Sequence, residues 1–580
     1  MSSGLRDAFR RGTDLVAIAV AGLLLLRLYA IYACVGLRLN QDAAEHLHVA
    51  FALERGERPY LDFIENHPML FNLGILALKR AFPQDTVLGL YMLVRLSVFL
   101  AFAGCIYYVY RLCVDYCRHE ASPLHAVSVL MLVFVFFGIL PEANSYLWDA
   151  RPDWFCYLLS LACIHAHYRV HGRSTADWTP GDYLALGLGG MAGGLATAVL
   201  AKSLYIFAPY AVVAGLIFAQ RVRASRVEIR RLLAANALFA GIGILVFCVA
   251  VAGELSATGA TLDAYYKANF VINRATHLVG SLEATPSSQL VAMAAIGPWP
   301  LLFVASAAAA LLLTSFRERR YFRFYTLVFA FLLIGFNILL LASTNAAYWF
   351  HGFAPSLLGL LAIGFVLLHS LLAWLVRVME GRVAPLHPEA PSVALYSRIG
   401  YGTAMIFFVL TGFSFVARVG DAARDFENLE FSRAIRELTS DGQPAELLAD
   451  RLLPAQLTYL VFSPDSMSIR ARHWGYFFML GPDRGFWMDN YNLGIGPDPK
   501  TYWRDLYATA PPDAVLFSDI TGDFIRVRER LLRNQGVDIS WLSAHLKRDY
   551  ICIAQPGVAV YVRPEHMLQF SGRKWTRCGV

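Results

Sequence analysis

The sequence predicts a polytopic α-helical membrane protein with about eleven transmembrane helices and a C-terminal soluble domain of the α/β or α+β type. Of the 580 residues, 57% are apolar and 16% are charged, whereas soluble proteins average about 25% charged residues. The charge is also uneven, because 54 charged residues lie in the first 419 and 39 in the last 161. We therefore predict a membrane part, 1–419, and a soluble extracytoplasmic domain, 420–580.

Apolar runs define the predicted spans, since a helix needs about 20 such residues to cross the hydrocarbon core. They lie near 15–37, 88–110, 125–140, 154–168, 183–200, 204–219, 232–253, 291–314, 324–342, 352–376 and 397–417.

Arginine clusters orient these spans, because basic residues mark cytoplasmic loops. With a cytoplasmic N-terminus, every basic cluster between spans falls on the cytoplasmic side. This leaves a first outer loop, 38–87, a turn near Lys202, the 254–290 loop and the tail outside. The Arg- and Ala-rich composition is typical of a bacterium. We therefore predict a multi-pass protein of the bacterial inner membrane with a periplasmic C-terminal domain.

The first outer loop begins with an amphipathic stretch, Asp42 to Arg55, closed by Gly56, which is typical of a helix lying at the membrane interface. On such a helix Asp42, Glu45 and His46 share one face. Two carboxylates beside an imidazole suit general-base chemistry on a hydroxyl group. The structural alternative is that Asp42 is an N-cap and Glu45 its capping-box partner.

A second polar group, Arg151-Pro152-Asp153, stands at the outer end of the fourth span. Pro152 fits a first helical turn, and Asp153 suits the positive end of the helix dipole. Structure alone would explain both residues, but a guanidinium here could also hold an anionic headgroup. Lys202 lies between two apolar runs, where a cation must reach the interface or pair with an anion.

Further outward-facing polar residues follow later in the chain. Lys267, Asn269 and Arg274 belong to a predicted interfacial helix, and Tyr348 and His351 precede the tenth span. For the aromatic group around Tyr348 the alternative is an ordinary interfacial belt.

The tail is expected to alternate helices and strands. We predict helices at Asp421 to Leu438, 499–508 and 523–534, and strands at 457–462, 514–517 and 558–562. Of the nine cysteines, only Cys552 and Cys578 fall in the tail, and in an oxidising compartment they could form a disulfide.

The chain lacks the sequence motifs of several common enzyme classes. The chain has no P-loop, no G-x-G-x-x-G followed by a helix and no H-E-x-x-H. No cysteine pair has zinc-ligand spacing, and nothing in the charge pattern calls for nucleic acid. An enzyme of this kind would need a substrate that is already activated.

Together these features resemble the GT-C superfamily of integral-membrane glycosyltransferases, in particular the branch with protein O-mannosyltransferases and bacterial aminoarabinose transferases for lipid A. The resemblance rests on the acidic motif that opens the first outer loop, the Gly56 to Asp62 run, His67-Pro68, Arg151-Pro152-Asp153 and a soluble domain after the last span. It implies transfer of a sugar from a polyprenyl-phosphate donor on the extracytoplasmic face, usually with inversion. The acceptor could be a lipid, a glycan or a protein.

The resemblance also implies roles for individual residues. Asp42 is the expected base, with Glu45 and His46 as alternates or positioning groups. Members of the branch often carry two adjacent acidic residues, whereas two alanines separate Asp42 from Glu45 here, so the base stays open between them. The expected ligands of the donor phosphate are Arg151, Lys202, Arg274 and His351. The expected substrate-binding residues are Tyr60, Glu65, His67, Asp153, Lys267 and Tyr348.

No cofactor is expected, although metal-dependent relatives make a divalent ion at Asp42 and Asp153 an alternative. Two other functions remain open at this stage. A transporter or flippase of a lipid-linked glycan would be expected to show an internal repeat about a central site, and we find none. A non-catalytic envelope-assembly subunit predicts that Asp42 tolerates alanine.

Overall fold

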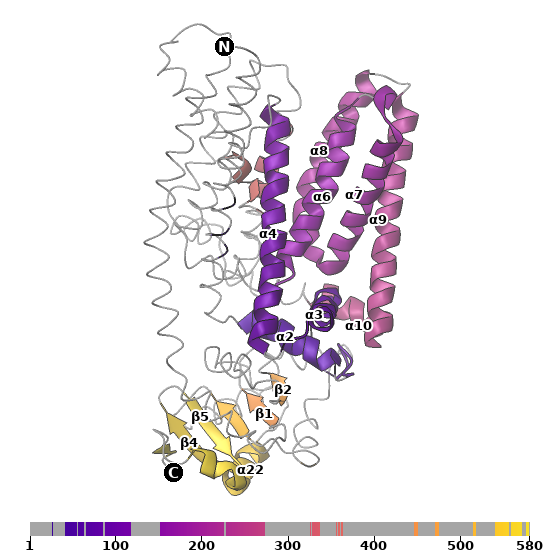
Figure 1. Ribbon diagram of the computed structural model, residues 1–580. Helices are drawn as coiled ribbons and strands as arrows, with labels where there is room; N and C mark the ends of the chain where they lie inside the picture. The colour runs from indigo at the N-terminus through magenta and orange to yellow at the C-terminus, as the bar shows by residue number, and fades with distance from the viewer. Residues whose placement is uncertain are drawn as a thin grey trace, which may run out of the picture.

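The computed structural model of the protein is built around a bundle of long helices (Figure 1). The residues that it describes are 22, 26, 29, 41–54, 56–62, 65, 67–84, 87–117, 151–173, 175–224, 228–272, 325, 328–336, 355, 358–359, 361–363, 446–449, 470–474, 508, 514–517, 540–555, 558–570 and 576–578.

Five helices form the described part of the bundle and run side by side in Figure 1. They are α4 (Val87–Cys117), α6 (Asp153–His171), α7 (Pro180–Val199), α8 (Leu204–Ala224) and α9 (Glu228–Thr258). Each coincides with a predicted span. Among the described residues, Gly89–Leu112, Ala201–Arg223 and Ile229–Thr258 are long and apolar enough to cross a membrane. The chain is therefore a helical membrane protein.

The total of eleven spans stays a prediction. The described residues within 324–342 and 352–376 are helical, as are residues 22, 26 and 29 in the first predicted span. The predicted spans 125–140, 291–314 and 397–417 lie outside the described residues.

Glycines let α7 approach α9 closely. A Cβ added at Gly190 would overlap the carbonyl oxygen of Phe239, and one added at Gly194 would overlap that of Gly243. Small residues at such a crossing allow two backbones to touch, which is how helices associate in a membrane that supplies no hydrophobic drive between them.

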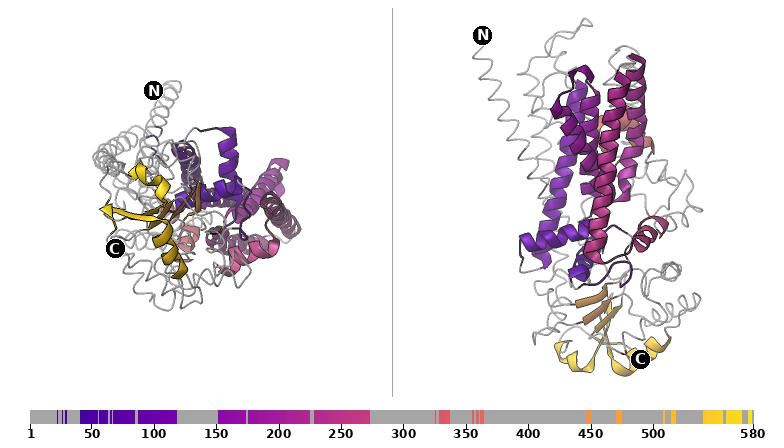
Figure 2. Two further views of the ribbon diagram at one scale, coloured as in Figure 1. Left: turned by 90° about the horizontal axis from the view of Figure 1, so that it is seen from below. Right: turned by 90° about the vertical axis from the view of Figure 1, so that its right-hand side faces the viewer.

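A layer of short helices covers one end of the bundle (Figures 1 and 2). It consists of α2 (Gln41–Glu54), α3 (Leu70–Ala81), α10 (Leu262–Tyr266) and the π-helical turn η3 (Lys267–Ile272). The helix predicted from Asp42 onward is confirmed as α2, and Gly56 comes after it with a φ of +84°. The place of α2 at the membrane interface stays a prediction. Lys79 ties α3 to α2 through Glu54, with 2.6 Å between Nζ and Oε2.

The opposite end of the bundle carries arginines. Arg221 on α8 donates to the carbonyl oxygens of His171 and Arg173, at 2.9 and 2.7 Å. Arg231 on α9 donates to the carbonyl of Thr175 in the short helix η1 (Thr175–Asp177), at 3.3 Å. These contacts fix the connection between α6 and α7 at the end where basic clusters were predicted.

A six-stranded sheet lies beyond the layer of short helices, with β2 next to α2 (Figure 1). Its order is β2-β1-β3-β5-β4-β6. β1 pairs in parallel with β2 and β3, and the other pairs are antiparallel. The strands are β1 (Glu446–Ala449), β2 (Arg470–Trp474), β3 (Ala514–Phe517), β4 (Ile551–Gln555), β5 (Val558–Val562) and β6 (Thr576–Arg577), with α22 (Ser540–Asp549) before β4 and η6 (Pro564–Phe570) after β5.

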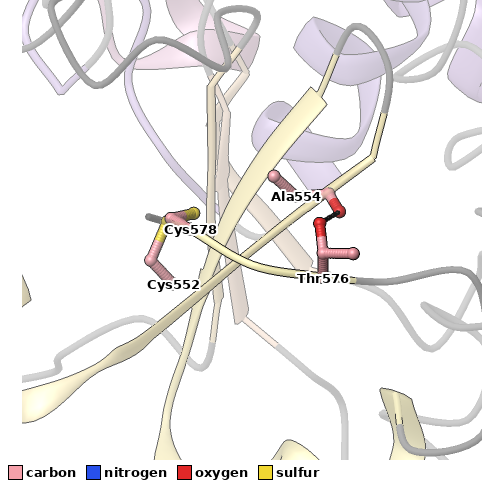
Figure 3. Close-up of a disulfide and its surroundings, with 4 residues drawn as sticks. All are labelled: Cys552, Ala554, Thr576 and Cys578. Carbon is pink, nitrogen blue, oxygen red and sulfur yellow. Dashed lines mark hydrogen bonds between the residues drawn. A yellow bond between two sulfur atoms is a disulfide. The ribbon is translucent and has the colours of Figure 1, made fainter. Parts of the chain in front are cut away.

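The strands predicted at 514–517 and 558–562 are confirmed as β3 and β5. The predicted strand 457–462 and the predicted helices at 421–438 and 523–534 lie outside the described residues, as does 499–508 apart from residue 508. Cys552 and Cys578, whose pairing the sequence left open, form a disulfide with their Cα atoms 5.4 Å apart (Figure 3). It joins β4 to the residue after β6, beside the hydrogen bond from Thr576 Oγ1 to the Ala554 carbonyl.

Candidate active site

Two cations and one carboxylate meet at the end of the bundle that faces the short helices. Arg151 immediately precedes the N-terminus of α6, and Asp153 is the first residue of that helix, with Pro152 as its N-cap. Lys202 lies in a single 3₁₀ turn, η2 (Ala201–Ser203), between α7 and α8. The predicted turn at Lys202 and the predicted helix start at Pro152 are both confirmed.

The Asp153 carboxylate binds both cations, one through each oxygen. Lys202 Nζ lies 2.8 Å from Oδ1, and Arg151 Nε lies 3.1 Å from Oδ2. Arg151 and Asp153 are buried, and 14% of the Lys202 side chain is exposed. Of the two alternatives predicted for Lys202, the interface or an anionic partner, the structure shows the anionic partner. The charges of these three side chains sum to +1, so their electrostatics favour an anion such as a phosphate.

A second cluster is formed by the first outer loop. Glu65 is buried, and its Oε1 accepts hydrogen bonds from the backbone nitrogen of His67 at 3.1 Å and from His67 Nδ1 at 2.7 Å. The His67 ring lies 5.7 Å from the ring of His46 on α2. A buried carboxylate bonded to an imidazole is an arrangement that can orient the ring.

Tyr60 is the polar centre of the same loop. Its side chain is fully buried, and its hydroxyl donates to the His67 carbonyl at 2.9 Å and accepts from Asn269 Nδ2 at 3.1 Å. Burial raises the pKa of Tyr60 well above its usual value, with a further contribution from the negative charge of Glu254, so the hydroxyl keeps its proton. The backbone of Tyr60 has a φ of +68°, a left-handed conformation that costs an L-residue roughly 1–2 kcal/mol.

Glu254 anchors the other side of the loop, and the sequence does not predict this role. Its Oε1 accepts from the backbone nitrogen of Met69 at 2.8 Å. Met69 is the N-cap of α3 and makes no side-chain capping bond. The Glu254 carboxylate, from α9, instead satisfies the backbone N–H of Met69 at the positive end of the helix. The 254–290 segment was predicted as a loop. This is wrong at its start, because α9 continues to Thr258 and carries Glu254 beyond the apolar part of the helix.

Aromatic rings connect the two clusters. Phe71 on α3 lies 5.3 Å from the His46 ring and 5.9 Å from the ring of Phe155 on α6. Phe155 is two residues after Asp153 in the same helix. The loop cluster and the cation cluster therefore lie at one end of the bundle, separated by an apolar contact.

The structure describes the positions of only some of the remaining predicted site residues. Asp42, Glu45 and His46 occupy positions i, i+3 and i+4 of α2, and Asp42 lies inside the helix as the structure bounds it, which removes the N-cap alternative. The side chains of Asp42 and Glu45 lie outside what the structure describes, as do Arg274, Tyr348 and His351. Lys267 forms a surface pair with Asp263 at 2.6 Å. Within the described residues no group of three His, Cys, Asp or Glu side chains could hold a metal ion.

Sequence comparison gives no family, since no family model matches the chain and no curated protein matches it either. Solved structures do resemble it. The crystal structure of ArnT from Cupriavidus metallidurans bound to undecaprenyl phosphate has a TM-score of 0.54 at 12% identity, over 95% of this chain and 98% of that one.

Two further structures match less well. The archaeal oligosaccharyltransferase AglB from Archaeoglobus fulgidus, in complex with an inhibitory peptide and a dolichol-phosphate, has a TM-score of 0.49 at 10% identity over 95% and 74% of the two chains. Arabinosyltransferase EmbB from Mycobacterium smegmatis has a TM-score of 0.40 at 13% identity over 71% and 41%. The likeness to ArnT spans nearly both chains and confirms the predicted resemblance at the level of the fold: the chain has a GT-C-like fold.

Proposed function

We propose that the protein is a glycosyltransferase that moves a sugar from a polyprenyl-phosphate donor to a lipid, glycan or protein acceptor on the extracytoplasmic face of the membrane. The observation that carries the proposal is the cation cluster of Arg151 and Lys202 at the end of a membrane bundle with a GT-C-like fold. A lipid phosphate sits where the bilayer meets water, and guanidinium and ammonium groups at that depth suit it.

In the proposed reaction, the bond between the anomeric carbon and the phosphate oxygen breaks as the acceptor hydroxyl attacks from the opposite side. The electron pair of that bond leaves with the phosphate, where Arg151 and Lys202 stabilise the developing charge. A carboxylate of α2, Asp42 or Glu45, takes the proton of the acceptor hydroxyl, with His46 beside it. Arg274 and His351 are further proposed phosphate ligands, and no metal ion is required in this scheme.

The proposal includes a setting in the cell. The membrane part, 1–419, would lie in the bacterial inner membrane with its N-terminus in the cytoplasm. The C-terminal domain, 420–580, would lie in the periplasm, where it could recognise the acceptor.

The test is transfer of radiolabelled sugar from a panel of polyprenyl-phosphate sugars by the purified full-length protein in detergent, with and without chelator. We expect transfer by the wild type, survival of activity in chelator, and at least a 100-fold loss in Asp42→Asn, since general-base catalysis contributes about 10²–10⁴-fold. Asp62→Asn is the matched control from the same loop. Asp62 pairs with Arg58 on the surface, and asparagine keeps an oxygen that can accept from the Arg58 backbone nitrogen.

Three results would change the proposal. Full activity of Asp42→Asn together with loss in Glu45→Gln would move the base to Glu45. Loss of wild-type activity in chelator would contradict the metal-independent mechanism. No transfer from any donor, in a preparation that still binds the lipid, would overturn the enzyme in favour of a transporter or an assembly subunit.

A further inference from the structure

The first outer loop is held to the bundle by two contacts from distant parts of the chain. Glu254 at the outer end of α9 accepts from the Met69 nitrogen, and Asn269 in η3 donates to the Tyr60 hydroxyl. The partners are separated by 185 and 209 residues. Between these two anchors the loop contains Glu65 and His67, so the position of that pair is set from outside the loop.

The hydrogen bonds at Tyr60 have a fixed direction. Asn269 Nδ2 lies 3.0 Å from the Tyr265 carbonyl oxygen, which can only accept, so this atom is the amide nitrogen. Its second hydrogen points to the Tyr60 oxygen, which must then accept. The single proton of Tyr60 is left for the His67 carbonyl. Asn269 thus directs the hydroxyl proton of Tyr60 onto His67.

The backbone of Tyr60 has an unfavourable left-handed conformation, and the loop keeps a tyrosine there in spite of it. Tyr60 is the one described residue other than glycine with a positive φ. A glycine would adopt that conformation without strain, but it would supply neither the buried ring nor the hydroxyl. Strain of this kind persists where surrounding contacts hold it, and here they hold the ring at 6.4 Å from Tyr265 in an edge-to-face contact.

We infer that Tyr60, directed by Asn269, is a positioning residue that fixes His67 and Glu65 against α2, the helix that carries the proposed base. The inference rests on the proposed function for its catalytic meaning. The chain of contacts runs from Asn269 to the Tyr60 hydroxyl and from there to the His67 carbonyl, and the His67 ring then meets His46 of α2. A buried tyrosine whose hydroxyl is bonded on both sides acts through these neighbours. The substrate contact predicted for Tyr60 from the sequence is the competing hypothesis.

The test compares Tyr60→Phe with Tyr265→Phe in the full-length protein. Both substitutions remove one hydroxyl from a buried tyrosine, and the two rings touch each other. Of these two hydroxyls, the one on Tyr60 is bonded to the His67 carbonyl of the loop. We expect Tyr60→Phe to speed hydrogen exchange of the backbone amides of His67 and Met69 about five-fold. We expect it to lower kcat about ten-fold with KM for the donor unchanged, because misplacing a site group by about 1 Å can cost up to about 100-fold. Tyr265→Phe should change neither quantity.

A double variant tests the link to Asn269. If both residues act through the His67 carbonyl, Tyr60→Phe combined with Asn269→Ala should lose no more activity than the more impaired single variant. Independent losses that multiply would overturn the inference.

The other outcomes are equally decisive. A raised KM with unchanged kcat in Tyr60→Phe would show a substrate contact and overturn the positioning role. Equal effects of the two tyrosine substitutions on exchange would overturn it as well. If the wild type transfers no sugar, the proposed function fails, and the exchange measurement alone decides whether Tyr60 holds the loop.

Discussion

Asp153 is the residue on which the cation cluster depends, because each of its carboxylate oxygens binds a different cation. Isolated ion pairs on a surface contribute little to stability. A buried pair behaves differently, since removing one partner leaves the other charge without compensation in a medium that solvates it poorly. Asp153 therefore has a structural role in addition to the substrate contact that the sequence predicts for it.

Replacing this carboxylate gives a stability prediction. Asp153→Ala should destabilise the protein by on the order of 3 kcal/mol, because Arg151 and Lys202 would then repel each other in a buried site. The measurement is the thermal unfolding midpoint of the purified protein in detergent. Asp263→Ala is the control, since the Asp263 side chain is 71% exposed and its pair with Lys267 is worth at most about 0.5 kcal/mol. Equal unfolding midpoints for the two variants would contradict the structural role of Asp153.

Parts of this site were predictable from the residues alone, and parts were not. The position of Lys202 between two apolar runs predicted that its ammonium group either reaches the interface or pairs with an anion, and the structure shows the pair. The identity of that partner was not readable, because Asp153 is 49 residues away. Glu254 was missed because its bond to Met69 spans 185 residues. Its only sequence signal is an acidic residue at the end of a long apolar run.

At the scale of elements, hydropathy located the helices but not their ends. The predicted span 232–253 lies within α9, which has 31 residues. The length of an apolar run reflects the thickness of the hydrocarbon core, which a helix of about 20 residues crosses. The helix itself continues until its backbone changes direction, and α9 ends before Gly259, which has a φ of +68°. The fold class, α2 and the strands β3 and β5 followed from local patterns. α3 did not, because its capping and packing come from α9 and α2.

The contact between α7 and α9 gives a prediction at the same scale. Gly194→Ala should destabilise the protein by about 1–3 kcal/mol, because the added Cβ would overlap the backbone of Gly243 and force the helices apart. The control is Gly241→Ala on α9, an exposed glycine with no described atom within 4 Å of an added Cβ. That substitution should be neutral or slightly stabilising. Thermal midpoints in detergent compare the two, and an unchanged midpoint in Gly194→Ala would refute close packing at this crossing.

At the scale of the whole molecule, polarity is divided between the two ends of the bundle. The short helices, the cation cluster and the sheet lie at one end, and the arginine contacts around η1 lie at the other (Figure 1). α9 runs from Glu228 at the second end to Thr258 at the first. At about 1.5 Å per residue it is about 45 Å long, enough to cross the hydrocarbon core of about 30 Å. We therefore predict that the two ends face opposite sides of the membrane.

This arrangement predicts which side each end occupies. Arginines resist translocation, and a disulfide such as Cys552–Cys578 persists in an oxidising compartment. Both lead us to predict that the sheet lies in the periplasm. Introduced cysteines test this in spheroplasts treated with a membrane-impermeant maleimide. Lys547→Cys on α22 and Arg230→Cys on α9 change two exposed residues at opposite ends.

Lys547→Cys should be labelled in intact spheroplasts, and Arg230→Cys only after permeabilisation. The wild type measures the background from the native cysteines. The reverse pattern would place the proposed site in the cytoplasm, where thiols are kept reduced and the disulfide would not persist. Labelling of both variants in intact spheroplasts would mean that α9 does not cross the membrane. Either result would remove the reason for assigning the donor phosphate to the outer leaflet. Asp153 begins α6 at the end that meets α3 through Phe155 and Phe71, and Lys202 pairs with it there.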